Sequence, residues 1–103
     1  MAIDKLILRP NAKLRFLEVL AFYTDIDENL GRRFNEQVEK CLNYIKDNPY
    51  LFRKCYGEIR VCYTKTFPYA IFYIVKFTPR TLKERVYVIN ILHTKRKIRY
   101  RNN

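Results

Sequence analysis

A single histidine, His93, is the side chain in this sequence whose ordinary pKa lies nearest to neutral pH. Two arginines, Arg60 and Arg96, carry planar guanidinium groups that can hold a phosphate through paired hydrogen bonds. Glu58 stands near the start of the strand-rich half and could accept a proton. Cleavage of RNA through its own 2′-hydroxyl needs a base, cations on the crowded phosphate and an acid for the leaving 5′ oxygen. We assign these catalytic roles to Glu58, to the two arginines and to His93, respectively.

Each of these residues also has an ordinary structural interpretation. A histidine at the end of a strand is often held by hydrogen bonds within the fold. An arginine on a strand is commonly solvated, and a glutamate in a basic region commonly pairs with a neighbouring cation. The residue types alone leave both interpretations open for His93, Arg60 and Glu58.

The C-terminal segment 95–103 is a basic tail with one aromatic ring between its cations. Basic groups can pair with phosphates while an aromatic ring stacks on a base, so we predict that this segment binds nucleic acid. The alternative is a frayed tail that only improves solubility. The predicted nucleic-acid-binding residues are Lys95, Arg96, Lys97, Arg99, Tyr100 and Arg101.

The formal net charge of +11 lies entirely in the second half of the chain. Residues 1–52 hold eight Lys and Arg against eight Asp and Glu, which cancel. Residues 53–103 hold thirteen Lys and Arg against two acidic residues, and 13 − 2 gives the whole +11. Segregated charge attracts polyanions, whereas a solvated surface normally mixes both signs. A nucleic acid or an acidic protein is the expected partner, with simple solubility as the alternative.

Several classes of site and location are not expected. The three cysteines show no metal-ligand spacing and the chain has one histidine, so we expect no metal and no cofactor. Their odd number favours reduced thiols in the cytoplasm over a disulfide framework. Two glycines are too few for a glycine-rich phosphate loop. The longest apolar run, 69–75, is too short to span a membrane, and residues 1–4 lead into structured sequence without a signal peptide.

Two helices are predicted in the first half, after a short strand at Ile3–Leu8 that ends before Pro10. Within Asn11–Thr24, apolar residues recur with helical spacing. Asp27 is a plausible N-cap for a second helix, and Asn48-Pro49 would end it. The apolar stripe of that second helix is Leu30, Phe34, Val38, Cys41, Leu42 and Ile45.

The second half reads as strands because its apolar period changes from 3.6 to two. The predicted strands are 58–64, 67–77 and 85–93, with an exposed basic hairpin loop at 78–84. Arg60 faces the open side of the sheet if Ile59, Val61 and Tyr63 pack on the helices. We therefore predict one α+β domain over residues 1–103 with the order β-α-α-β-β-β. Its helical hairpin packs on one face of a mostly antiparallel four-stranded sheet.

Four motifs in this order resemble the RelE/ParE superfamily of type II toxins, also known from plasmid stabilisation. Asn48-Pro49 is similar to the family's exit from the second helix, and Arg60 lies in a strand of the family's type. The run 67–73, FPYAIFY, resembles the third strand of one branch. The run 91–96, ILHTKR, is similar to the ending of the fourth strand. The resemblance covers nearly the whole chain.

The resemblance implies a toxin that a cognate acidic antitoxin neutralises by covering it. Members of the superfamily either cleave mRNA, usually on the ribosome, or inhibit DNA gyrase without cleaving RNA. Ala70 stands where the nuclease branch usually has an arginine, which favours gyrase, whereas His93 and the basic tail favour a metal-independent endoribonuclease. We expect mRNA cleavage, with a gyrase inhibitor or a simple nucleic-acid-binding domain as the alternatives.

Overall fold

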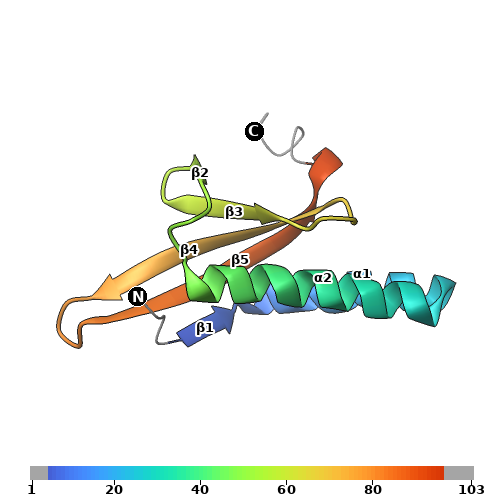
Figure 1. Cartoon of the computed structure of the whole chain (residues 1–103), viewed down its shortest axis with the longest axis horizontal. Helices are drawn as coiled ribbons and strands as arrows, with labels where there is room; N and C mark the ends of the chain where they lie inside the picture. Colours follow the sequence, from blue (N-terminus) through green and yellow to red (C-terminus); the bar gives the residue numbers. More distant parts are fainter. Residues whose placement is uncertain (1–4, 97–103) are drawn as a thin grey trace.

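A computed structural model describes residues 5–96, apart from the side chain of Arg96. One strand leads into two consecutive helices, and the remaining strands follow in the second half (Figure 1). The chain is therefore an α+β protein, as the sequence predicted. The elements are β1 Lys5–Leu8, α1 Pro10–Ile26, α2 Glu28–Asp47, β2 Lys54–Tyr56, β3 Ile59–Tyr63, β4 Tyr69–Thr78, β5 Lys83–His93 and the 3₁₀ helix η1 Thr94–Arg96.

The strands form one sheet of five in the order β1-β5-β4-β3-β2. β1 pairs with β5 in parallel, and the other pairings are antiparallel. The first strand thus returns to the sheet as predicted, but the prediction of four strands missed β2. That strand has three residues and an irregular register against β3. A segment this short carries no readable alternation, so the sequence period could not reveal it.

Local signals place the helix ends close to where the sequence predicted them. α1 begins with Pro10, whose fixed φ suits a first turn. Asp27 separates the helices and caps α2, because its side chain accepts a hydrogen bond of 2.9 Å from the Asn29 backbone N–H. α2 ends at Asp47, before Asn48-Pro49. The one-residue link turns the helices back on each other as a helical hairpin.

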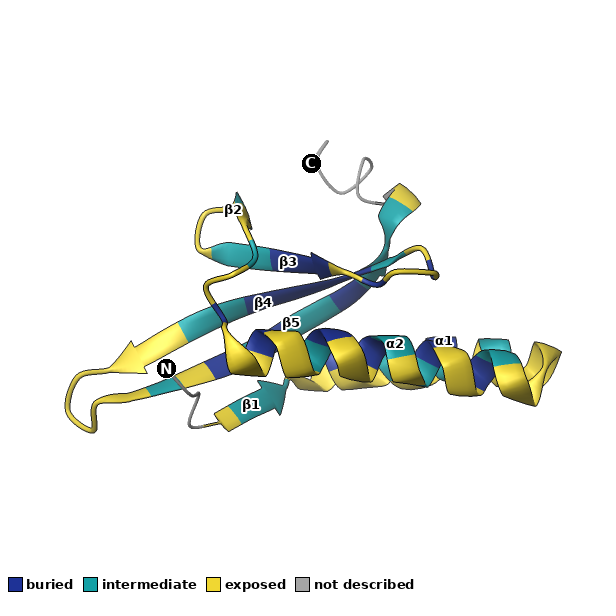
Figure 2. Cartoon of the chain, in the orientation of Figure 1, coloured by how far each residue is buried: buried dark blue, intermediate teal, exposed yellow. Residues whose placement is uncertain are grey.

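The two helices cover one face of the sheet and bury the main core against it. Figure 2 shows buried residues repeating along the helices and gathered in the middle of the sheet. The predicted stripe of α2 lies in this core, with Phe34, Val38, Cys41 and Ile45 buried. Four aromatic rings meet there with centroids 5.0–6.4 Å apart: Tyr23, Phe34, Phe67 and Tyr69.

The two helices approach each other closely at Gly31 of α2. A Cβ added there would lie 2.1 Å from the Thr24 hydroxyl oxygen and 3.0 Å from the Thr24 Cα. Real side chains do not tolerate such distances, so a larger residue would push α1 and α2 apart. Gly31 therefore sets the spacing of the helical hairpin.

A second, smaller cluster lies on the open face of the sheet, which we define as the face turned away from α1 and α2. Val61 is buried in this cluster, together with Ala70 and Phe72, while Cys62 is buried in the core beneath the helices. Arg60 was predicted to lie on the open face if its neighbours in the strand packed on the helices. Val61 packs on the open face instead, so the predicted orientation of Arg60 was wrong. Arg60 shares the helix-side face with Cys62, because alternate residues of a strand face the same way. Both faces of β3 are apolar, so its alternation could not identify the helix side.

β4 and β5 continue past the rest of the sheet as a two-stranded hairpin, which Figure 1 shows projecting at one end of the molecule. We call residues 76–85 the arm. Residues 76–83 are all exposed, which includes most of the basic loop predicted at 78–84; Glu84 is half-buried, and the strands extend to Thr78 and from Lys83. Within the described part of the chain, no helix is both long enough and apolar enough to cross a membrane.

Candidate functional site

His93 ends β5 on the helix-side face of the sheet, half-buried beside Tyr69 of β4. The two rings meet edge to face, with centroids 5.2 Å apart and an interplanar angle of 78°. His93 Nδ1 accepts a hydrogen bond of 3.2 Å from the Lys95 backbone N–H. When His93 is neutral its proton therefore lies on Nε2, the nitrogen available to a ligand.

A hollow of about 290 Å³ opens beside His93 between α1 and the ends of β4 and β5. Arg15 and Glu18 of α1 line it and form a loose ion pair of 3.9 Å with each other. An acid, a base and a cation thus border one space. The lining residues are Arg15, Glu18, Val19, Phe22, Tyr69 and His93.

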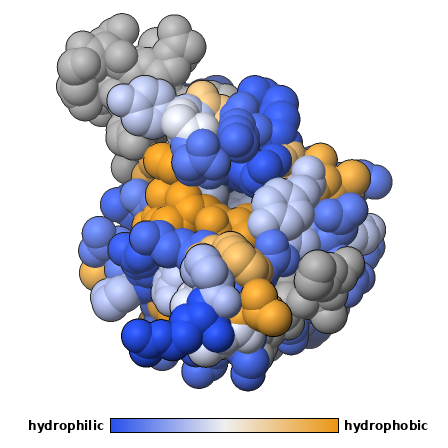
Figure 3. Space-filling model, turned by 90° about the vertical axis from the view of Figure 1, so that its left-hand side faces the viewer, coloured by the Kyte–Doolittle hydropathy of each residue, from blue (hydrophilic) through white to orange (hydrophobic). Residues whose placement is uncertain are grey.

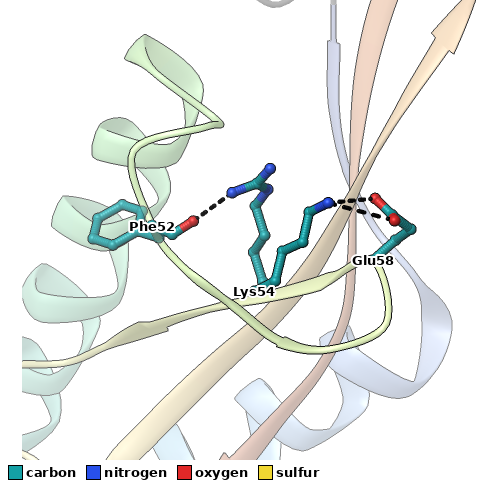
Figure 4. A network of polar contacts seen from close by, with 4 residues as sticks. Phe52, Lys54 and Glu58 are labelled. Carbon is teal, nitrogen blue, oxygen red and sulfur yellow. Dashed lines mark hydrogen bonds and ion pairs between the residues drawn. The ribbon is translucent and has the colours of Figure 1, made fainter.

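Arg60 lies elsewhere and is engaged in structural contacts. Its Nη1 donates a hydrogen bond of 2.7 Å to the Phe52 carbonyl (Figure 4), and its guanidinium carbon lies 5.2 Å from the centre of the Tyr50 ring. Both partners belong to the loop between α2 and β2. Arg60 therefore fastens that loop to the sheet, through a charge-assisted hydrogen bond and a cation–π contact.

Tyr73, the register partner of Arg60 on β4, also contacts the loop between α2 and β2. Its ring is fully buried and its hydroxyl donates a hydrogen bond of 2.7 Å to the Pro49 carbonyl. Burial raises the pKa of Tyr73 to about 12, against the opposing effect of the nearby Arg60 cation. Arg60 and Tyr73 together hold residues 49–52 against the sheet.

Glu58 lies in the turn between β2 and β3 and is exposed. Its carboxylate pairs with Lys54 Nζ at 3.2 Å (Figure 4). An exposed pair of this kind adds little stability. Gly57 beside it has φ +54°, a left-handed conformation that suits a glycine in a tight turn.

The structure does not bring the side chains of His93, Arg60 and Glu58 together. Arg60 is paired with Tyr73 and His93 with Tyr69, four residues apart on β4, which corresponds to about 13 Å along the sheet at 3.3 Å per residue. Glu58 lies two residues further away, about 20 Å from His93 by the same measure. One phosphodiester cannot reach all three side chains, since an acid or base acts at about 3 Å.

The remaining predicted residues are only partly described. Lys95 is exposed in η1, and the backbone of Arg96 belongs to the same short helix, directly after His93. Lys97, Arg99, Tyr100 and Arg101 lie outside the described residues. Within residues 5–96, no group of three or more His, Cys, Asp or Glu side chains is placed to hold a metal ion.

Sequence reasoning missed three neighbours of His93, namely Tyr69, Arg15 and Glu18. Tyr69 pairs directly with His93, but a register shift between Phe72 and Tyr73 means that counting residues back from the hairpin would not have aligned the two. Arg15 and Glu18 are three residues apart on α1, a spacing that only predicts a surface ion pair. Their place beside His93 depends on how α1 crosses the sheet, which no local pattern records.

The family model described as the ParE toxin of the type II toxin–antitoxin system parDE matches residues 6–98. The chain belongs to the ParE toxin family. The match begins within β1 and ends just beyond η1, so it includes the helical hairpin and residues of every strand. No curated protein sequence matches the chain.

Membership of the ParE family makes this chain a type II toxin, and a cognate antitoxin is its partner. The resemblance inferred from Asn48-Pro49, Arg60 and the two late strands is therefore confirmed. In this ParE toxin, Arg60 and the residues after α2 are part of the framework of the fold. His93 and its hollow lie at the start of β4, four residues along that strand from the partner of Arg60.

Proposed function

We propose that this ParE toxin acts by binding and inhibiting DNA gyrase, without cleaving RNA. The observation that carries the proposal is the separation of His93, Arg60 and Glu58, each of which lies with different partners. The ParE family match and the alanine at position 70 support the same choice. This reverses the expectation of mRNA cleavage stated from the sequence and its family resemblance.

The chemistry of RNA cleavage explains why separation matters. A base, an acid and a cation must act on one phosphate within hydrogen-bond distance. Apo sites are often loose by an ångström or two, but they do not close over 13 Å through a β-sheet, where backbone hydrogen bonds fix the strands. A binding toxin needs only a surface, and the positive second half supplies one.

Two parallel assays test the proposal. In the first, purified toxin is added to DNA gyrase and relaxed plasmid, and supercoiling is followed on agarose gels. In the second, it is added to a cell-free translation extract, and message ends are mapped by primer extension. We expect blocked supercoiling and intact messages, with His93→Ala as effective as the wild-type chain. Messages cut by the wild-type toxin but not by His93→Ala, with normal supercoiling, would overturn the proposal.

A second candidate, an endoribonuclease centred on His93, is favoured by one observation. His93, Glu18 and Arg15 border the same hollow and could provide acid, base and phosphate-binding cation there. This set differs from the one that the sequence suggested. Under this alternative, Glu18→Gln and His93→Ala each abolish message cleavage, and Glu58→Gln does not affect it.

The partner and the compartment complete the proposal. The antitoxin is expected to be acidic, because it must compensate a toxin of net charge +11. Cys41, Cys55 and Cys62 are all free thiols, two of them buried, which suits a protein of the reducing cytoplasm. Copurification of the toxin with the product of a short neighbouring acidic reading frame tests the partner.

A further inference from the structure

The arm, residues 76–85, combines features that the proposed function does not use. It holds four cations, Lys76, Arg80, Lys83 and Arg85, against one carboxylate, Glu84. A two-stranded ribbon is only marginally stable by itself, and this one extends from the sheet with residues 76–83 exposed (Figure 2). Such an extension needs a reason other than core formation.

The strand register places three of the cations on one face of the arm. Lys76 is directly opposite Arg85, and Thr78 is opposite Lys83. All four side chains point to the open face, because the next pair inward, Val75 and Val86, packs in the core beneath the helices. Lys5 of β1 extends the row, since it pairs with Arg85 from the other side.

The row Lys5, Arg85 and Lys76 crosses three adjacent strands with the same sign, so positive groups lie side by side across this part of the sheet. A polyanion lying across the row would be attracted by all three groups.

The single carboxylate of the arm lies on its other face. Glu84 is opposite Phe77 and accepts a hydrogen bond from the Tyr50 hydroxyl, which raises the pKa of Tyr50. This contact ties the base of the arm to the loop that Arg60 and Tyr73 hold in place. The arm is therefore braced at its base, and its one carboxylate lies on the face opposite the basic one.

We propose that the arm binds duplex DNA by entering the major groove, with its cations on the phosphates and Leu82 at the tip against the base edges. The ribbon of two strands about 4.8 Å apart, with its side chains, matches a groove about 12 Å wide. The exposed length from Lys76 to Pro79, about 10 Å at 3.3 Å per residue, exceeds the groove depth of about 8.5 Å.

Two features favour DNA over an acidic protein as the occupant. The basic face of the arm consists of Lys76, Thr78, Lys83 and Arg85, with no apolar side chain. Protein interfaces are depleted in lysine at their centre, whereas DNA interfaces are strongly positive and polar. The apolar contact comes from Leu82, which is 77% exposed at the tip and can meet a thymine methyl group.

The shape of the arm also distinguishes DNA from RNA. The major groove of A-form RNA is too narrow and deep for side chains to read. The inference concerns DNA binding by the toxin alone, so it holds or fails independently of whether gyrase is the target.

The principal test is a comparison of two double variants of the full chain with the same net charge. Lys76→Gln/Arg80→Gln removes two cations from the arm, and Lys13→Gln/Lys40→Gln removes two exposed cations from the helices. Fluorescence anisotropy measures binding to a 20-base-pair duplex of mixed sequence between 50 and 200 mM salt. The basic tail is present in every variant, so its contribution cancels.

We expect the arm variant to lose about 60-fold in affinity at 0.1 M salt. Each phosphate contact contributes about 0.9 to the slope of log affinity against log salt, so two lost contacts weaken binding by about ten to the power 1.8 at this salt concentration. The magnitude of its salt slope should fall by about 1.8, whereas the helix variant should bind nearly as the wild type does. Equal affinities of the two double variants would overturn the proposal. An equal loss on a 20-base-pair RNA duplex would also overturn it, because groove entry requires B-form DNA.

A second measurement locates the contact without any substitution. Amide resonances of the labelled chain are followed by NMR during titration with a 12-base-pair DNA duplex. We expect the largest shifts at residues 76–85 and at Lys5. Shifts confined to the surroundings of His93, with the arm unchanged, contradict the proposal.

Discussion

Replacing Arg60 with methionine should destabilise the fold and leave the intrinsic activity unchanged. The change removes a hydrogen bond of 2.7 Å from a charged donor to the half-buried Phe52 carbonyl, a contact worth about 1.5–3 kcal/mol. It also removes the cation–π contact with Tyr50, worth about 0.5–1 kcal/mol. Methionine retains part of the aliphatic stem, so packing is largely kept.

The expected loss in the free energy of unfolding is about 2–3 kcal/mol, because such contributions overlap. In a domain of this size each kcal/mol lowers Tm by about 4–8 °C, so Tm should fall by at least about 8 °C. Urea unfolding followed by circular dichroism gives the free energy, and calorimetry gives Tm. Arg53→Met is the matched control, since Arg53 is an exposed arginine of the same loop and should change stability by less than about 0.5 kcal/mol.

The same variant distinguishes a framework arginine from a catalytic one. Inhibition of gyrase per folded molecule should equal that of the wild type, measured at a temperature where both are folded. The reasoning is refuted if Arg60→Met keeps its Tm and loses its inhibitory activity, because Arg60 would then act on the target.

Three further substitutions test other parts of the fold. Tyr73→Phe should lower stability by about 1–2 kcal/mol through loss of the hydrogen bond to Pro49. The pKa of Tyr73 in the folded protein, about 12, lies above its ordinary value of 10. The stability is therefore full below pH 10 and falls as the pH rises toward 12. The free energy of unfolding from urea titrations should depend less on pH in this range for Tyr73→Phe. Leu82→Gly should raise stability by about 0.5–1 kcal/mol, because Leu82 has φ +57° with its side chain exposed, and an unchanged or lower Tm contradicts this. Gly31→Ala should cost about 1–3 kcal/mol through the clash with Thr24, and a wild-type urea midpoint would show that the helices separate freely.

Much of the fold could be predicted because its signals are local. Asp27, Pro10 and Asn48-Pro49 mark the helix ends through backbone chemistry that depends on neighbours in sequence. The stripe from Leu30 to Ile45 predicts the buried side of α2 because only one of its faces is apolar. The two long strands were equally clear from their length.

The orientation of Arg60 could not be predicted, because it depends on which face of its strand meets the helices. Val61 and Cys62 are adjacent and both buried, one on each side of the sheet, so the sequence around Arg60 fits either orientation. The candidate site failed to assemble for a different reason. Arg60 and His93 share a face, but their separation along β4 follows from a strand register that the sequence does not state.

The parallel pairing of β1 with β5 affects how the toxin is made. Lys5 pairs with Arg85, so the earliest strand to be synthesised waits for the latest one before it can be incorporated. At a translation rate of about 5–20 residues per second, that interval is roughly 4–16 s, long after the local helical hairpin can form. A growing chain therefore exposes the apolar side of its helices while its closing strand is still missing. Any chaperone or antitoxin that recognises this surface has several seconds in which to reach the toxin before it is finished.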